Sequence, residues 1–185
     1  QFISEFNYLE QVSNSVDINI NSSGGSVLSG LSIFSTILNS STPTRAIITG
    51  VAASMSSVIA LAADETVMND FGTLMIHLPY SPSGEGSSEQ LDHFANMLSR
   101  IYEQRLGKTK EEVMTLLEGE EGEDGTWFTP EKALELGFIS SIIPTGIQVS
   151  LKKDADEFIL NKVESSEVAN KLQEIAANIT IPEIK

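Results

Sequence analysis

Segments with strand character alternate with helical segments along the first half of the chain, and this alternation limits the fold more than any other feature. Residues 17–21 alternate polar and apolar side chains, as a half-buried strand does. A helical pattern follows over 27–38, then a second strand over 45–49 and a helix rich in small residues over 53–63. This order predicts an α/β fold in which helices flank a mostly parallel sheet.

The middle of the chain continues the pattern and adds a long helix. Two more strands are expected at 65–69 and 73–78. Ser87 and Gln90 have the spacing of a capping box, so a helix should begin there and run to about Leu106. We expect this helix to bury one apolar stripe against the rest of the domain.

The remaining elements are shorter and end in a region with a weak pattern. Thr109 caps a short helix, an acidic loop follows, and a last strand is expected over 138–143. We therefore expect one domain over 1–145, with a trimmed N-terminus, and a tail over 146–185. The tail should be partly helical, around 166–177, and should contact the domain or another subunit.

The charge balance narrows the classes of function. Eleven Lys and Arg residues against 26 Asp and Glu residues give a net charge of −15. Nucleic-acid binding is not expected, because it needs a positive surface, and the same charge disfavours an anionic membrane. The longest apolar stretch, about 51–63, is too short and too polar to span a bilayer.

The cysteine and histidine counts remove several kinds of site. The chain has no cysteine, which excludes a thiol nucleophile and a Cys-ligated metal and fits a reducing compartment. The two histidines, His77 and His93, fall on different expected elements without metal-ligand spacing, so no metal is expected. No phosphate-binding loop occurs and no cofactor is expected. His93 is expected at the surface or at an interface.

Three segments could carry chemistry. Gly24 and Gly25 lie between a strand and a helix, where backbone N–H groups can face an oxyanion. Ser54 lies at the next strand-to-helix turn among small residues, which is similar to a nucleophile elbow; alternatively, it begins a tightly packed helix. His77 ends an apolar strand before Pro79, at the sheet edge where α/β proteins place their sites, or else it is a satisfied core histidine.

Together these segments resemble the Clp peptidase family. The matching runs are 21–27 (Asn-Ser-Ser-Gly-Gly-Ser-Val), 50–55 (Gly-Val-Ala-Ala-Ser-Met), 75–79 (Met-Ile-His-Leu-Pro) and 128–137 (Phe-Thr-Pro-Glu-Lys-Ala-Leu-Glu-Leu-Gly). The resemblance covers about residues 15–145. It implies a ClpP/crotonase-like fold with a protruding handle over 87–106 that interlocks stacked rings, although an ordinary amphipathic helix would have the same pattern. The sequence at 126–129 (Thr-Trp-Phe-Thr) looks most like that of the phage or prophage branch of the family, which includes head maturation proteases.

The resemblance also implies a role for individual residues. Ser54 is the nucleophile, and His77 is the general base that takes its proton. The N–H groups of Gly25 and Met55 form the oxyanion hole. A groove that holds the substrate peptide as an added strand is bordered by Gly24, Ser26, Leu78 and Pro79.

The acid of this triad is the least defined site residue. The family's aspartate lies four residues before the Ser or Thr that opens the next helix, and counting back from Thr129 reaches Gly125. A shift by one residue gives Asp124, which we take as the acid, with Glu123 as the alternative. If neither reaches His77, the imidazole tautomer is less well held and activity falls steeply.

The sequence therefore predicts a serine endopeptidase that forms an acyl-enzyme on Ser54 and assembles into homo-oligomeric rings. Its substrates would be unfolded polypeptides, or phage capsid or scaffold proteins, in the bacterial cytoplasm or in a phage prohead. Whether an unfoldase ATPase is a partner is left open. The alternatives are a catalytically inactive ring subunit, an acyl-CoA hydratase or isomerase of the crotonase type, and a peptide-binding module without turnover.

Overall fold

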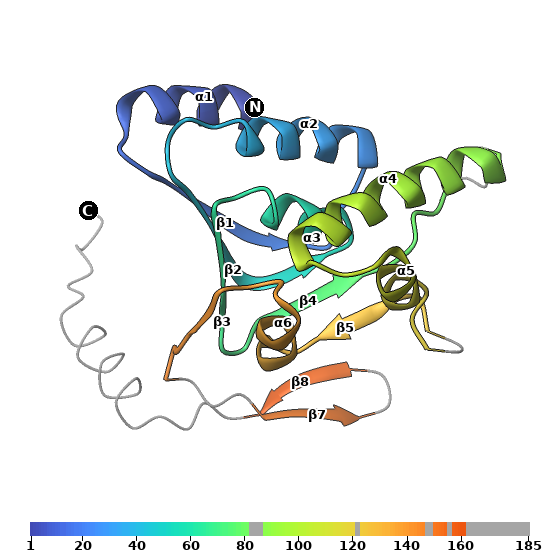
Figure 1. Cartoon of the computed structure of the whole chain (residues 1–185). Coiled ribbons are helices and arrows are strands. Elements are labelled where there is room, and N and C mark those ends of the chain that lie inside the picture. Colours follow the sequence, from blue (N-terminus) through green and yellow to red (C-terminus); the bar gives the residue numbers. More distant parts are fainter. Residues whose placement is uncertain (82–86, 121–122, 147–149, 155–156, 162–185) are drawn as a thin grey trace, which may run out of the picture. The chain divides into compact units, whose positions relative to one another are not determined.

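The chain divides into two compact units, Gln1–Ile143 and Pro144–Lys185, and each is described by itself (Figure 1). The computed structural model describes residues 1–81, 87–120, 123–146, 150–154 and 157–161. No helix in this described part of the chain has the length and apolar character needed to cross a membrane.

The first unit is built on a six-stranded sheet. Its strands are β1 (Val16–Ser22), β2 (Thr44–Ala53), β3 (Glu65–Asn69), β4 (Thr73–Ile76), β5 (Thr126–Phe128) and β6 (Ser141–Ile143). The central strand β2 pairs in parallel with β1, β3 and β4, and β3 pairs in parallel with β6. At the β5 edge the sheet is antiparallel, against β4. The expected mostly parallel sheet is therefore a mixed one.

The long strand β2 changes partner along its length. Residues 45–48 pair with β3, whereas residues 51–53 pair with β4. Between these stretches the Asn21 side chain fills the bend, since its Oδ1 accepts the Val51 N–H at 3.0 Å. A Cβ at Gly50 would lie 2.7 Å from that same oxygen, so the Asn21 amide can take this position only beside a glycine. The strand thus continues past residue 49, where the sequence pattern ends it, and the sheet curls.

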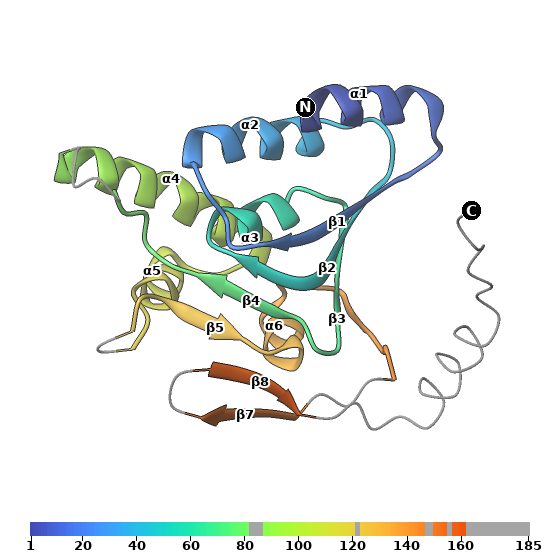
Figure 2. The same ribbon diagram turned by 180° about the vertical axis from the view of Figure 1, so that it is seen from behind.

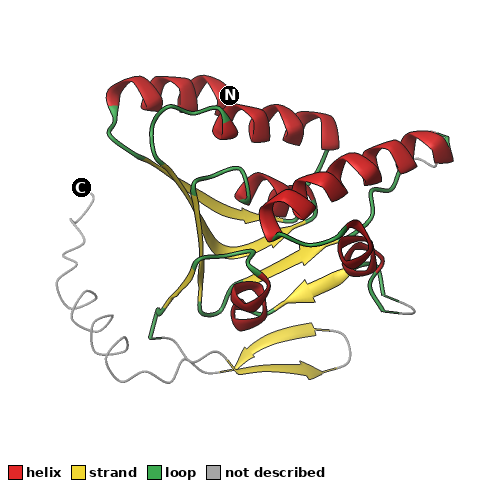
Figure 3. Ribbon diagram, in the orientation of Figure 1, coloured by secondary structure: helices red, strands yellow, loops and turns green. Residues whose placement is uncertain are grey.

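Helices pack around this sheet, as Figure 3 shows. They are α1 (Phe2–Val12), α2 (Val27–Leu38), α3 (Met55–Ala60), α4 (Ser88–Leu106), α5 (Lys110–Glu118) and α6 (Pro130–Leu136). The short helix α3 contacts β2, α2 and α4, and it therefore lies in the middle of the unit. The N-terminal end of α4 projects beyond the sheet in both views (Figures 1 and 2).

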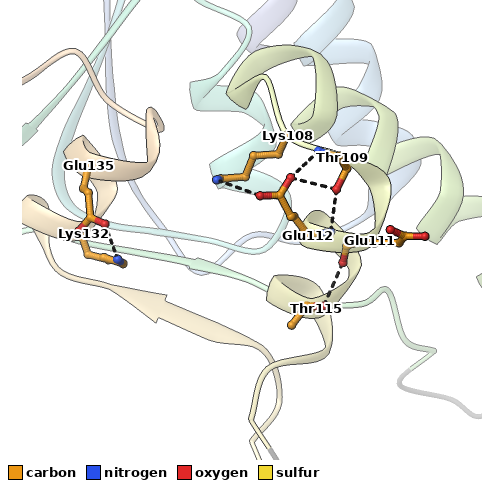
Figure 4. Close-up of polar contacts among 7 residues, drawn as sticks. All are labelled: Lys108, Thr109, Glu111, Glu112, Thr115, Lys132 and Glu135. Atoms are coloured by element: carbon orange, nitrogen blue, oxygen red, sulfur yellow. Dashed lines mark hydrogen bonds and ion pairs between the residues drawn. The ribbon is translucent and has the colours of Figure 1, made fainter.

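The helix starts agree with the capping residues in the sequence. Ser87 and Gln90 form a complete capping box at α4, and Thr109 and Glu112 form another at α5. Figure 4 shows the second box, in which the Glu112 carboxylate accepts the Thr109 N–H at 2.8 Å. The first helical position of α6 is Pro130, where the missing N–H has no partner to lose.

The core lies between the sheet and the helices. Its largest fully buried side chains are Ile37, Ile48, Met68, Leu74, Ile76, Tyr102, Leu117 and Phe138. Three aromatic rings join strand β5, helix α4 and the segment after α6. The Phe128 and Phe138 centroids lie 4.9 Å apart, and the Tyr102 ring meets the Phe138 ring edge-on at 6.2 Å.

Four elements have no counterpart in the sequence prediction. Helix α1 buries Phe6, and β5 buries Phe128 while leaving Trp127 exposed. In the second unit, β7 (Ser150–Asp154) and β8 (Glu157–Asn161) form an antiparallel hairpin. The helix expected around 166–177 lies outside the described residues.

Candidate active site

Ser54 occupies a strained turn between β2 and α3. Its φ of 55° and ψ of −129° make it the one non-glycine residue with positive φ in the described part of the chain. Such a conformation costs about 1–3 kcal/mol, so neighbouring contacts must hold it. The Ser54 N–H donates to Met75 O at 2.9 Å, and the Ser54 carbonyl accepts the Ser57 N–H at 3.0 Å. These bonds fix both ends of the turn.

His77 lies beside Ser54 because their strands are neighbours. Ala53, the last residue of β2, pairs with Met75 near the end of β4. Ser54 follows Ala53 directly, and His77 directly follows Ile76, the last residue of β4. The distance from Ser54 Oγ to His77 Nε2 is 2.7 Å, within the range expected of a nucleophile and its base. Both residues are half-buried, so they can be reached from solvent.

The surroundings of His77 favour a neutral imidazole. Partial burial lowers its pKa below the ordinary value, and the negative charge of Asp124 opposes that effect to a smaller extent. A neutral ring near pH 7 can accept the Ser54 proton through Nε2. The electrostatic surroundings of His77 therefore suit it to act as a general base towards Ser54.

Asp124 lies close enough to His77 to act on it through its charge, but no hydrogen bond joins the two among the described contacts. Asp124 and Glu123 both line the cleft beside His77, and both are exposed. Gly125, which the gapless count reaches, packs against the backbone of Ile76 and His77. A Cβ at this position would overlap the Ile76 carbonyl and the His77 side chain. The position therefore has no room for a carboxylate.

A cleft of about 570 Å³ opens next to His77. Both apolar and acidic residues line it, and they are Met75, His77, Leu78, Pro79, Tyr80, Leu117, Glu118, Glu123, Asp124 and Gly125. Leu78 and Pro79, which were expected to border a substrate groove, thus line this cleft. Gly24 and Ser26 are not among the residues that line this cleft.

The Gly24–Gly25 turn approaches Ser54 from another element. A Cβ on Gly24 would lie 2.7 Å from Ala53 O, 2.8 Å from Ser54 Cβ and 3.0 Å from Met55 N. The φ of Gly24 is also 100°, in the region that favours glycine. The backbone at 24–25 can lie against the Ser54–Met55 peptide only because residue 24 has no side chain.

Two contacts at the site have no signal in the sequence. The Tyr80 ring lies 5.6 Å from the His77 ring, tilted by 53°, and its side chain is exposed on the cleft wall. The Ser56 hydroxyl lies within 2.8 Å of both Ser22 O and Ala53 O, which links β1 to the Ser54 turn. His93 is exposed on α4 and lies apart from this site, lining a different surface hollow.

The chain is similar to known proteolytic subunits of Clp proteases. The proteolytic subunit of the ATP-dependent Clp protease of Streptococcus sanguinis is 30% identical over 153 residues, covering 76% of this chain and 76% of that protein. Proteolytic subunit 2 from Tropheryma whipplei is 32% identical over 133 residues, covering 66% and 70%. A solved structure of a ClpP1 mutant from Listeria monocytogenes has a TM-score of 0.69 at 24% identity, covering 77% of this chain and 82% of that one.

The structural similarity establishes a ClpP-like α/β fold with a curled, mixed sheet. The sequence similarity extends through the segments that carry Gly24, Ser54 and His77, since the profile of the Clp protease family matches residues 1–146. This match spans most of the chain, and the chain therefore belongs to the Clp protease family.

Proposed function

We propose that the chain is a serine endopeptidase that cleaves polypeptides through an acyl-enzyme on Ser54. The observation that carries this proposal is the 2.7 Å contact between Ser54 Oγ and His77 Nε2 at a strained turn. The names of the relatives, which are proteolytic subunits, support the same reaction class.

The proposed reaction follows from these contacts. His77 Nε2 takes the Ser54 proton as Oγ attacks the scissile carbonyl, and the protonated imidazole then gives this proton to the leaving amine. The N–H groups of Met55 and Gly25 would hold the oxyanion of the tetrahedral intermediate. A water molecule, deprotonated by His77, then releases the acyl group from Ser54. Asp124 would stabilise the imidazolium by its charge.

The substrate would be an extended polypeptide bound in the cleft beside His77. Leu78 and Pro79 give that cleft an apolar wall, and the adjoining chain could pair with an added strand. By similarity to its relatives, the protein would act as an oligomeric ring, and a Clp ATPase could deliver substrates to it. Processing of capsid or scaffold proteins in a phage prohead remains a prediction from the amino-acid sequence at 126–129.

The test uses Ser54→Ala and a fluorophosphonate probe, which reacts with an activated serine. The wild-type protein should be labelled and should cleave unfolded polypeptide, and Ser54→Ala should lose both activities with its fold intact. Labelling retained in Ser54→Ala would overturn the nucleophile assignment. An unlabelled, inactive wild-type protein would instead favour the inactive ring subunit, and calorimetric binding of coenzyme A would favour the crotonase-type alternative.

A further inference from the structure

A buried chain of hydroxyl groups joins helix α4 to the Ser54 turn. Tyr102, on α4, is 2% exposed, and its hydroxyl lies 2.8 Å from the Ser57 Oγ. Ser57, on α3, is fully buried, and its Oγ lies 2.7 Å from the carbonyl oxygen of Ser54. The chain therefore starts in a helix that is distant from Ser54 in sequence and ends on the backbone of the proposed nucleophile.

The number of protons fixes the direction of this chain. The Ser54 carbonyl can only accept a hydrogen bond, so the single hydroxyl proton of Ser57 goes to it. Ser57 must then accept from Tyr102, which therefore donates. Burial raises the pKa of Tyr102 well above its ordinary value, so that the phenol keeps its proton. Edge-on contact with Phe138 holds the ring in place.

The Ser54 carbonyl matters because it belongs to the same peptide group as the Met55 N–H. A trans peptide is planar, and its C=O and N–H point in opposite directions. A bond that fixes the oxygen on one side therefore aims the hydrogen on the other. Ser54 has positive φ, so this peptide is held in a strained conformation, and the Ser57 hydroxyl adds a second bond to an oxygen that the Ser57 N–H already holds at 3.0 Å.

We propose that Tyr102 and Ser57 are positioning residues that aim the Met55 N–H at the oxyanion. This inference rests on the proposed function, in which Ser54 is the nucleophile and Met55 supplies an oxyanion donor. Such a donor acts on charge that develops only in the transition state. Its misalignment should therefore lower kcat and leave KM nearly unchanged.

The first variant is Tyr102→Phe, which keeps the ring packed and removes the donor. We expect kcat to fall about tenfold, less than the 10²–10³ that loss of a whole oxyanion donor costs. The affinity for a peptide boronate, which mimics the tetrahedral intermediate, should fall by a similar factor, whereas the affinity for a product peptide should not change. The pH midpoint of kcat/KM should stay the same, because His77 is not touched.

A second variant, Ser57→Ala, interrupts the same chain from the other side. If the two hydroxyls act as a unit, Tyr102→Phe should cost nothing further in the Ser57→Ala background. The control is Ser99→Ala, which removes a fully buried hydroxyl from α4 that bonds Glu103 and not the Ser54 turn. This control should keep the wild-type kcat and boronate affinity.

Three results would overturn the inference. They are wild-type kcat and boronate affinity in both variants, a loss that Ser99→Ala shares, and losses that add in the double variant. Circular dichroism of each variant checks that the fold is retained, and either variant alone can carry the test if the other unfolds. Ser54→Ala separates this inference from the proposed function. If Ser54→Ala loses labelling while Tyr102→Phe keeps wild-type kinetics, the positioning role is rejected and the proposed function stands.

Discussion

The positions of Ser54 and His77 follow from short sequence motifs, whereas the position of Asp124 does not. Ser54 and His77 each follow a strand end, and the pairing of Ala53 with Met75 brings them together. The motifs around these two residues are therefore enough to predict that their side chains lie close together. The position of Asp124 depends instead on how the whole loop after α5 folds, and no periodic pattern describes that loop. Sequence spacing alone could not choose between residues 123, 124 and 125.

Asp124→Asn tests the acid. In the proposed mechanism its charge supports the imidazolium that forms on His77, so kcat should fall at least about tenfold while KM changes little. The matched control is Glu123→Gln, which removes a neighbouring charge from the same cleft and should stay near wild type. Steady-state cleavage of a fluorogenic peptide measures both. If Glu123→Gln causes the larger loss, Glu123 is the acid.

The pH dependence of kcat/KM tests the state of His77. Burial lowers its pKa, so kcat/KM should rise with pH through a midpoint below 6.5 and then level off. Asp124 raises this pKa, so the midpoint should move further down in Asp124→Asn. The lowered pKa also makes the folded protein less stable as pH falls below 6.5, because the unfolded chain then binds the proton more readily. A midpoint above 6.5 would contradict the burial argument.

At the scale of elements, residues with capping and alternating patterns were predictable, and short or irregular elements were not. The capping boxes at Ser87 and Thr109 mark the starts of α4 and α5. Strand β5 has only three residues, too few to show an alternation, and it exists because Phe128 packs on the core. The continuation of β2 past Gly50 depends on the Asn21 side chain, which belongs to another strand.

Gly50→Ala tests this bend. The added methyl group would meet Asn21 Oδ1 at 2.7 Å, and we expect a loss of about 1–3 kcal/mol in the free energy of unfolding. Asn21→Ala alone should cost about 1 kcal/mol, because the Val51 N–H loses its acceptor. In the double variant Gly50→Ala should cost less than it does alone, since the clashing oxygen is gone. Urea unfolding followed by circular dichroism measures these values, and strict additivity would reject the explanation.

At the scale of the whole molecule, the sequence predicted the fold class and the family but not the details of the second unit. The hairpin of β7 and β8 falls where the sequence pattern weakens, and side-chain periodicity of two five-residue strands is easily hidden by charged residues. The family resemblance ends near residue 145, and the matched profile ends at 146. Beyond that point, the sequence has no motif from which a fold could be predicted.

Assembly is the prediction that belongs to this scale. The 20.0 kDa chain should run in native mass spectrometry as a multiple of its own mass, as expected of a ring. Ser54→Ala should give the same assembly, because it removes a single half-buried hydroxyl oxygen. A single-chain mass at micromolar concentration for both proteins would reject a stable ring.

Gly24 packs against Ser54 and Gly125 packs against His77, from segments far apart in the sequence, and neither position leaves space for a methyl group. Replacing either glycine with a residue that carries a side chain should therefore abolish the proposed hydrolysis, even where Ser54 and His77 are both retained. A genome survey that classes a related sequence as an active peptidase from its serine and histidine alone would therefore count some inactive sequences as active. Inspecting these two glycine positions as well would identify degenerate copies that the usual pair of residues conceals.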